Sequence, residues 1–276
     1  MNGAAVLPPV APGWDCHVHV FDETAPAAPG HYQAAHRPLE DIEALAATQG
    51  LGHLVLVQPS VYGNDHRVML QALRQRPGRH AGVAVVDAGV SDATLDDLHA
   101  AGVRGARFNL VSPVGNRDSE APSLLAPRLA ARGWHIQWYA RATDLPRIAA
   151  LHAMDGAPVA VLDHLAGLHP GVPPGAAWQA LARLAAQGAW IKLSGWYRLG
   201  EPPSANPADW TGLDATLARV AALFDQRCVF GSDWPHTAYA PDALPDYAAM
   251  AGPIVRALGA QAWADIRLGG ARLYAP

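Results

Sequence analysis

Two histidines lie two residues apart in an apolar stretch near the start of the sequence. They are His17 and His19 in "WDCHVHVFD" (residues 14–22), where an aspartate stands on either side. Because side chains alternate between the faces of a β-strand, we expect both imidazoles to project from one face and Val18 from the other. The same alternation places Cys16 opposite the histidines. Two buried imidazoles need a hydrogen-bond partner, a ligand or a metal ion, so this spacing predicts a polar or metal-binding site.

Eight short apolar runs, rich in β-branched residues, recur along the 276 residues. They cover residues 14–20, 53–58, 81–86, 103–108, 134–139, 159–162, 190–194 and 227–231. Segments with helical spacing separate several of them, among them residues 38–50, 91–102, 122–133 and 175–188. Regular alternation of strand and helix favours parallel pairing, and eight units can close on themselves. We therefore predict one (β/α)8 TIM-type barrel over residues 1–276. The alternative, an open doubly wound sheet, calls for a glycine-rich phosphate loop that the sequence lacks.

Smaller signals accompany this prediction. Ser91 and Asp144 are placed as helix N-caps, and glycines stand where helices would end, at positions 102, 133 and 188. Cys16 and Cys228 are predicted to fill space on the outer, helix-facing side of the strands.

Composition limits the class of protein. Apolar residues make up 50% of the chain and charged residues only 16%, which provides for a large core. The net charge is −4 and no run of Lys or Arg occurs, so neither nucleic acid nor an anionic membrane is an expected partner. The first residues do not resemble a secretory signal, and two cysteines make no disulfide framework. We expect a cytoplasmic protein, whose oligomeric state the sequence leaves open.

Polar side chains follow the predicted strands at their carboxyl ends, where (β/α)8 barrels carry their chemistry. In chain order they are His17, His19, Ser60, Arg107, Asn109, Tyr139, Arg141, Asp163, His164, Arg198, Asp233 and His236. An aspartate beside imidazoles can act as a base toward water, and a planar guanidinium suits a carboxylate. The predicted barrel mouth therefore has the groups that ester hydrolysis requires.

These motifs, taken together, resemble the amidohydrolase superfamily. The similar blocks are "DCHVHVFD", "VLVQPSVYGND", "RGARFN", "LDHLAG", "IKLSGWYRLG" and "VFGSDWPH", which run in order from residue 15 to 236. Within the superfamily they resemble the branch of 2-pyrone-4,6-dicarboxylate lactonase, sugar-acid lactonases and 4-sulfomuconolactone hydrolase. The resemblance implies hydrolysis of a small lactone that carries a carboxylate.

The resemblance also implies residue roles. Asp233 would take a proton from the attacking water. The three histidines His17, His19 and His164 would polarise the lactone carbonyl, or hold a metal that does. Substrate contacts would come from Arg107, Arg198, Tyr32, Ser60, Asn109, Tyr139 and His236.

One position departs from the dicarboxylate lactonase. Pro113 stands where that family member has a further arginine, six residues past the one matched by Arg107. Because a missing guanidinium leaves one carboxylate without its clamp, we expect a lactone with a single carboxylate.

The sequence leaves two interpretations of the role of a metal ion. His17, His19, His164 and Asp233 could hold one divalent ion such as zinc, with three nitrogens and an oxygen. Turnover without metal is the alternative. The strand that ends at Phe108 carries no Lys or Glu at its mouth, so a two-metal centre is not expected.

We expect three other polar residues to have structural roles. His135 stands at the start of its strand, far from the predicted mouth, Lys192 is expected to be ion-paired inside the barrel, and Asp163 is expected to orient a neighbour. Asp233 as a helix cap and the arginines as structural ion pairs are the plainer alternatives. For function, the alternatives to a lactone hydrolase are a sugar-acid lactone isomerase, a superfamily decarboxylase and a binding module that has lost catalysis.

Overall fold

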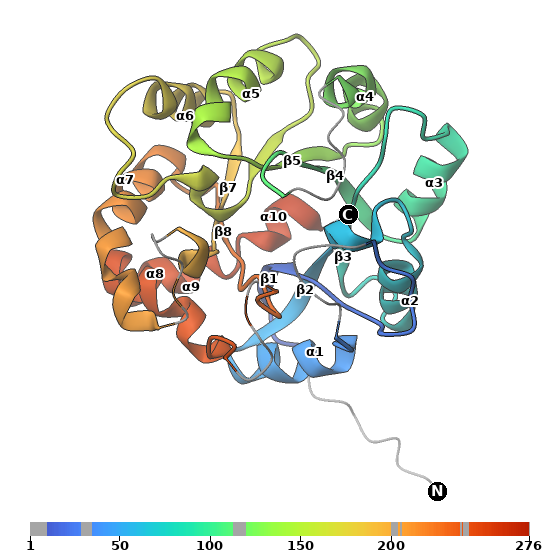
Figure 1. Ribbon diagram of the computed structural model, residues 1–276, viewed down its shortest axis with the longest axis horizontal. Helices are drawn as coiled ribbons and strands as arrows, with labels where there is room; N and C mark the ends of the chain where they lie inside the picture. The colour runs from blue at the N-terminus through green and yellow to red at the C-terminus, as the bar shows by residue number, and fades with distance from the viewer. Residues whose placement is uncertain are drawn as a thin grey trace, which may run out of the picture.

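Eight parallel strands form one sheet, in which the strand order follows the sequence from β1 to β8 (Figure 1). The computed structural model describes residues 10–28, 35–112, 120–199, 204, 206–237, 239 and 243–275. The strands are β1 (Gly13–Val18), β2 (Leu51–Val57), β3 (Ala81–Ala84), β4 (Val103–Asn109), β5 (His135–Tyr139), β6 (Ala160–Leu162), β7 (Trp190–Leu193) and β8 (Cys228–Phe230). All eight coincide with the predicted apolar runs.

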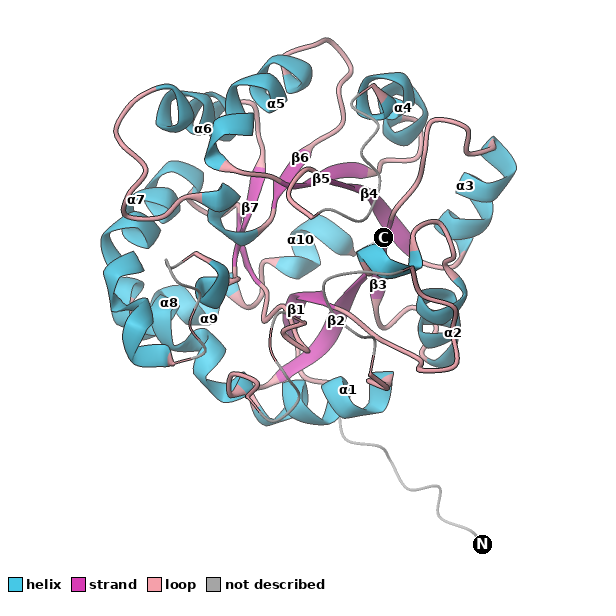
Figure 2. Ribbon diagram, in the orientation of Figure 1, coloured by secondary structure: helices cyan, strands magenta, loops and turns pink. Residues whose placement is uncertain are grey.

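Helices surround this ring of strands (Figure 2). They are α1 (Leu39–Thr48), α2 (Arg67–Gln75), α3 (Asp92–Ala100), α4 (Ala121–Ala130), α5 (Leu145–His152), α6 (Ala176–Ala186), α7 (Asp214–Phe224), α8 (Gly252–Leu258) and α9 (Ala260–Ile266). The predicted (β/α)8 barrel is therefore confirmed. That one domain extends over all of residues 1–276 stays a prediction.

The last helix, α10 (Gly270–Tyr274), lies inside the ring in this view rather than outside it (Figure 1). Its Tyr274 is buried against Trp14 of β1 and His135 of β5, with ring centroids 6.2 and 5.3 Å away. These contacts lie at the amino ends of the strands, so α10 closes the floor of the barrel. His135 belongs to this floor, as its position at the start of a strand predicts.

The ring closes between β1 and β8 through a few main-chain contacts. The N–H of Asp233 donates to the carbonyl of His17 at 2.8 Å, and the N–H of His19 donates to the carbonyl of Trp234 at 2.9 Å. The residues predicted to do chemistry therefore also form the seam of the barrel.

The direction of Cys16 differs from the prediction. In the ladder between β1 and β2, Asp15 pairs with Leu54 and Val18 with Leu56, so β1 carries one residue more than β2. This is a β-bulge, which interrupts the alternation of side chains. Cys16 consequently packs inside the barrel with Val229 and Tyr274, while His17 also faces inward. Cys228 packs in the helix-facing core, as predicted.

The helix ends follow the sequence signals in part. The Ser91 side chain accepts the N–H of Thr94 and caps α3. The three predicted glycines all have positive φ. Asp144 precedes α5 but does not cap it, because its carboxylate accepts the N–H of Arg141 instead. Among the described residues, no helix is both long and apolar enough to cross a membrane.

Candidate active site

A small cavity of about 30 Å³ lies at the carboxyl ends of the strands. Its walls are formed by His19, Ser60, Arg107, Asn109, Ser112, Tyr139, His164, Arg198, Asp233 and Thr237. Most of these are the residues that the sequence places at strand ends. His17 is fully buried beside them. The barrel thus brings together side chains from β1, β4 and β5 and from the turns after β2, β6, β7 and β8.

Asp233 makes a different set of contacts with each carboxylate oxygen. Its Oδ2 accepts hydrogen bonds from Arg198 Nε at 2.7 Å and from the Tyr197 hydroxyl at 2.5 Å. Its Oδ1 has no hydrogen-bond partner among the described residues, but lies 3.3 Å from His19 Nε2 and 3.5 Å from His17 Nε2. Burial alone would raise the pKa of Asp233, but the charge of Arg198 and the nearby imidazoles hold it well below its usual value. The carboxylate is therefore ionised at neutral pH, with one oxygen free to act.

Asp15 fixes the turn that carries Asp233. One oxygen of Asp15 accepts the N–H of His17 at 3.1 Å and that of Ser232 at 2.9 Å, and the other accepts the Tyr247 hydroxyl at 2.9 Å. Asp233 itself has a φ of 62°, which a non-glycine residue seldom adopts. Such a conformation costs free energy and persists where surrounding contacts impose it. The bond from Ser232 N–H to Asp15 is one of these contacts, and the bond from Asp233 N–H to the His17 carbonyl at 2.8 Å is another.

His17 lies between Asp233 and a second buried carboxylate, Asp163. Its Nδ1 is 3.2 Å from Asp163 Oδ1 and 3.3 Å from Lys192 Nζ. Burial lowers the pKa of His17 well below its usual value. Asp163 also accepts a hydrogen bond from Arg107 Nε at 2.9 Å. The expected role of Asp163, orienting its neighbours, agrees with these contacts, as does an ion-paired Lys192.

The other two imidazoles are held through their Nδ1 atoms. His19 Nδ1 is 2.8 Å from the carbonyl oxygen of Val57, which can only accept, so this nitrogen carries the proton. His164 Nδ1 is 2.9 Å from the hydroxyl of Ser194. A Cβ on Gly195 would lie 2.6 Å from that same ring, so a larger residue would displace it. Burial lowers the pKa of His164 to about 4, which leaves a neutral imidazole at neutral pH.

The arrangement around Asp233 fits a cation. One ligand atom each from His17, His164 and Asp233 lie within 4.8 Å of one another. Neither His17 Nε2 nor Asp233 Oδ1 has a hydrogen-bond partner among the described residues, although both are buried. His19 Nε2, the ring nitrogen that does not contact the Val57 carbonyl, lies 3.3 Å from Asp233 Oδ1. Facing lone pairs repel unless a cation or a shared proton lies between them. The residues therefore satisfy the chemistry of a mononuclear site with N and O ligands.

Two arginines present partly free guanidinium groups to the cavity. Arg107 uses its Nε for Asp163, and its terminal nitrogens have no hydrogen-bond partner in the described ranges. Arg198 uses its Nε for Asp233, and one terminal nitrogen is 3.4 Å from the Thr237 hydroxyl. Tyr139 lies between the two sides of the site, with Arg107 over its ring at 5.1 Å. The terminal nitrogens of both guanidinium groups could therefore bind a carboxylate, while each Nε keeps its hydrogen bond to a buried aspartate.

The remaining predicted contacts differ in placement. The Asn109 amide donates to the Ser60 hydroxyl at 2.9 Å, and both side chains line the cavity. His236 does not line it: the buried ring donates from Nε2 to the Ser232 carbonyl and lies edge-on to Tyr197, 5.2 Å away. Tyr32 lies outside the described residues. The roles assigned to these side chains stay predictions.

Sequence reasoning missed three polar neighbours of the site. Tyr197 donates to Asp233, Ser194 contacts His164, and Gln137 donates to Asp163 at 3.1 Å. All three lie in or directly after predicted strands, so their positions could have been noticed. Tyr197 stands directly before Arg198 in a 3-10 turn (Trp196–Arg198), where strand alternation gives no direction.

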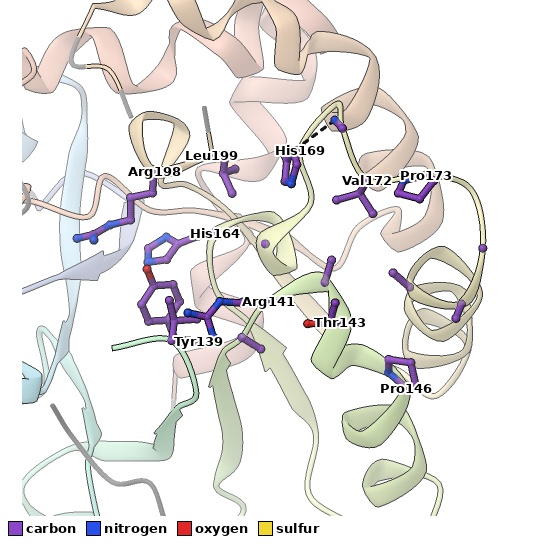
Figure 3. Close-up of a pocket in the computed structure, with 18 of the residues that line it drawn as sticks. Tyr139, Arg141, Thr143, Pro146, His164, His169, Val172, Pro173, Arg198 and Leu199 are labelled. Carbon is purple, nitrogen blue, oxygen red and sulfur yellow. Dashed lines mark hydrogen bonds between the residues drawn. The ribbon is translucent and has the colours of Figure 1, made fainter. Parts of the chain in front are cut away.

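A second, larger cavity of about 800 Å³ opens next to the first (Figure 3). Both cavities are lined by Tyr139, His164 and Arg198. Its other walls come from the segments that follow β5 and β6, including Arg141, Thr143, His169 and Val172. Figure 3 shows His164, Tyr139 and Arg198 grouped at one end and Pro146, Val172 and Pro173 at the other.

Comparison with known proteins identifies the family. A sequence profile of the amidohydrolase family matches residues 14–274. The chain is 33% identical over 245 residues to a 2-pyrone-4,6-dicarboxylate hydrolase of Comamonas testosteroni, covering 84% of this chain and 79% of that protein. It is 30% identical over 243 residues to a 4-sulfomuconolactone hydrolase of Rhizobium radiobacter, with the same two shares. The chain therefore belongs to the amidohydrolase family.

The chain is also similar to a more distant relative and to solved structures. A D-galactarolactone isomerase of Agrobacterium fabrum is 25% identical over 249 residues, covering 86% of this chain and 81% of that protein. A Pseudomonas putida structure, provisionally assigned as a 2-pyrone-4,6-dicarboxylic acid hydrolase, superposes with a TM-score of 0.80 at 27% identity, covering 95% and 97% of the two chains. A zinc-bound Burkholderia multivorans amidohydrolase shares the fold, with a TM-score of 0.73 at 22% identity over 95% of this chain and 99% of that one.

Proposed function

We propose that this protein is a lactone hydrolase that opens a small lactone carrying a carboxylate. The single observation that carries the proposal is the carboxylate of Asp233. One of its oxygens is held by Arg198 and Tyr197, while the other faces the imidazoles without a hydrogen-bond partner among the described residues. Two relatives named as lactone hydrolases support the substrate class.

Asp233 Oδ1 is the proposed base. A water molecule between this oxygen and the lactone carbonyl would lose its proton to Asp233 while its oxygen forms the new C–O bond. The ring C–O bond then breaks, and the leaving alkoxide or enolate takes up a proton, which gives a hydroxy acid or its keto tautomer. Positioned proton transfer of this kind contributes about 10² to 10⁴ in rate.

The carbonyl oxygen gains negative charge during the attack and needs a positive partner. His17, His19 and His164 would hold a single zinc ion together with Asp233, whose Oδ1 would then serve both as a ligand and as the base. When bound, that ion would act as a Lewis acid toward the carbonyl. Asp163 and the Val57 carbonyl keep the His17 and His19 rings oriented. We infer that turnover does not strictly require the ion, because the Arg198 guanidinium lines the same cavity and can itself donate to the carbonyl oxygen.

Arg107 and Arg198 would bind the substrate carboxylate, since their terminal nitrogens face the cavity. Tyr139, Ser60 and Asn109 would contact the ring, and Tyr32 and His236 are the further proposed contacts. We also propose a cytoplasmic location and one domain over residues 1–276. No nucleic-acid or membrane partner enters this proposal.

A panel of lactones with one carboxylate, two carboxylates or none tests the proposal. Hydrolysis releases one proton per turnover, which a pH indicator records, and mass spectrometry identifies the ring-opened acid. Release of protons with the carboxylated lactones alone is the expected result. Conversion into an isomeric lactone without proton release would instead place this protein with the D-galactarolactone isomerase.

A further inference from the structure

The small cavity at Asp233 has room for little more than the reacting part of a substrate. Its volume of about 30 Å³ is far below the range of about 300 to 1,000 Å³ that is typical of small-molecule sites. The neighbouring cavity of about 800 Å³ lies within this range and shares three wall residues with the small one. A substituent on the lactone ring would therefore extend into the neighbouring cavity.

The two cavities differ in chemistry. The small one is lined almost wholly by polar side chains, which suit a carbonyl and a carboxylate. Apolar groups dominate the large one, among them Val111, Ala142, Pro146, Val172 and Leu199. No acidic side chain belongs to its described lining. Arg141, at the end that also holds Tyr139 and His164, is its main charged group besides Arg198 (Figure 3).

We propose that the large cavity is a substituent subsite, which binds an apolar arm of several carbon atoms attached to the lactone ring. The inference deepens the proposed lactonase function and rests on it. It predicts that the preferred substrate is a lactone acid with such an arm rather than a bare lactone acid. An apolar arm gains from leaving water, whereas a hydroxylated arm would lose hydrogen bonds on the same walls.

Three ligands test the subsite: a lactone acid, the same compound with a butyl arm, and the same compound with a hydroxyl-rich arm of equal length. Each buried methylene group contributes about fourfold in binding, so kcat/KM for the butyl compound should exceed that of the bare acid by about tenfold or more. The hydroxyl-rich arm should show no such gain. A preference for the hydroxyl-rich arm, or an equal rate for all three, would overturn the proposal.

Val172 supplies the decisive variant, because it lines the large cavity and not the small one. Val172→Asp places a charge on the apolar wall and should abolish the butyl preference, measured as the ratio of kcat/KM values. The matched control is Val255→Asp, on α8, where the side chain is 41% exposed and lines neither cavity. That control should keep the ratio. If both variants keep it, the arm does not bind in this cavity.

A binding measurement separates the subsite from the proposed function. The three ligands are titrated calorimetrically into the Asp233→Asn protein, in which the lactones should survive. Tighter binding of the butyl compound, with hydrolysis of no lactone by the native protein, would keep the subsite and refute the lactonase. Hydrolysis without any dependence on the arm, in rate or in binding, would keep the lactonase and refute the subsite.

Discussion

The partly buried guanidinium of Arg198 and the buried carboxylate of Asp233 form an ion pair, with 2.7 Å between Nε and Oδ2. The pair uses one nitrogen of the fork and one oxygen of the carboxylate. It leaves the terminal nitrogens of Arg198 toward the cavity and Asp233 Oδ1 toward the histidines. One contact therefore sets the direction of both groups, the proposed base and the proposed carboxylate-binding guanidinium.

Asp233→Asn is expected to remove turnover. The amide keeps the shape and can still accept from Arg198, but it cannot take a proton at neutral pH, so kcat should fall by about 10² to 10⁴ while lactone binding largely persists. Steady-state kinetics and calorimetry measure the two effects. Asp155→Asn, at an exposed position on the surface, is the matched control and should behave as the native protein. A variant with more than about a tenth of the native kcat would refute Asp233 as the base.

Asp15→Ala tests how the base is positioned. The variant leaves two backbone N–H groups and the Tyr247 hydroxyl without their acceptor, which should cost about 2 to 4 kcal/mol in the free energy of unfolding. Urea unfolding measures this cost. Because the Ser232–Asp233 turn loses its anchor, kcat should fall more than KM rises. Tyr247→Phe removes one of the three bonds only and should cost about 1 kcal/mol. Equal kcat in Asp15→Ala and native protein would show that the turn holds itself.

The residue at position 113 is expected to select between substrates. With Pro113 in place of an arginine, a lactone with one carboxylate should be hydrolysed about a hundredfold better than 2-pyrone-4,6-dicarboxylate, since a buried carboxylate without a clamp costs a few kcal/mol. Pro113→Arg should narrow this difference in kcat/KM. Position 113 lies outside the described residues, so the prediction rests on sequence. If the dicarboxylate is the best substrate of the native protein, another cation, such as Arg141, binds its second acid group.

Metal content and activity should be measured on the same sample. We expect up to one zinc ion per chain by mass spectrometry, and activity that falls on chelation without vanishing. Full activity in metal-free protein would remove zinc from the mechanism. Complete loss, restored by one equivalent of zinc, would make the ion essential. His164→Gln should lower the zinc content, because His164 is one of the three residues whose ligand atoms lie within 4.8 Å of one another.

A buried histidine away from the site predicts how stability depends on pH. His80 accepts the N–H of Leu54 on Nδ1 and contacts Glu43 through Nε2, and burial lowers its pKa to about 4. Since the unfolded chain binds this proton near pH 6.5 and the folded chain does not, stability falls as pH drops from about 6.5 toward 4. His80→Gln cannot titrate, so its destabilisation should be about 2 kcal/mol smaller at pH 5 than at pH 7.5. An equal cost of His80→Gln at both pH values would contradict the assignment.

The sequence predicted the barrel well because each strand is a buried apolar run that a helix-forming segment follows. It predicted the main side chains of the site because strand ends converge in such a barrel. The predicted direction of the Cys16 side chain was wrong. Alternation of side chains assumes a regular ladder, whereas the bulge in β1 adds one residue. The link between Asp15 and Tyr247 could not be predicted, since the two residues are 232 positions apart and no local pattern joins them.

The closure of the barrel at β1 and β8 also bears on when the site can exist during synthesis. His17 leaves the ribosome early, in the first strand, while its main-chain partner Asp233 follows only after seven further strands have been made. Contacts between such distant segments are slow to form, because a long loop must close first. A nascent chain that stops before β8 therefore carries imidazoles and arginines but not Asp233, the proposed base. We expect the site to be complete only when the two ends of the sheet have met.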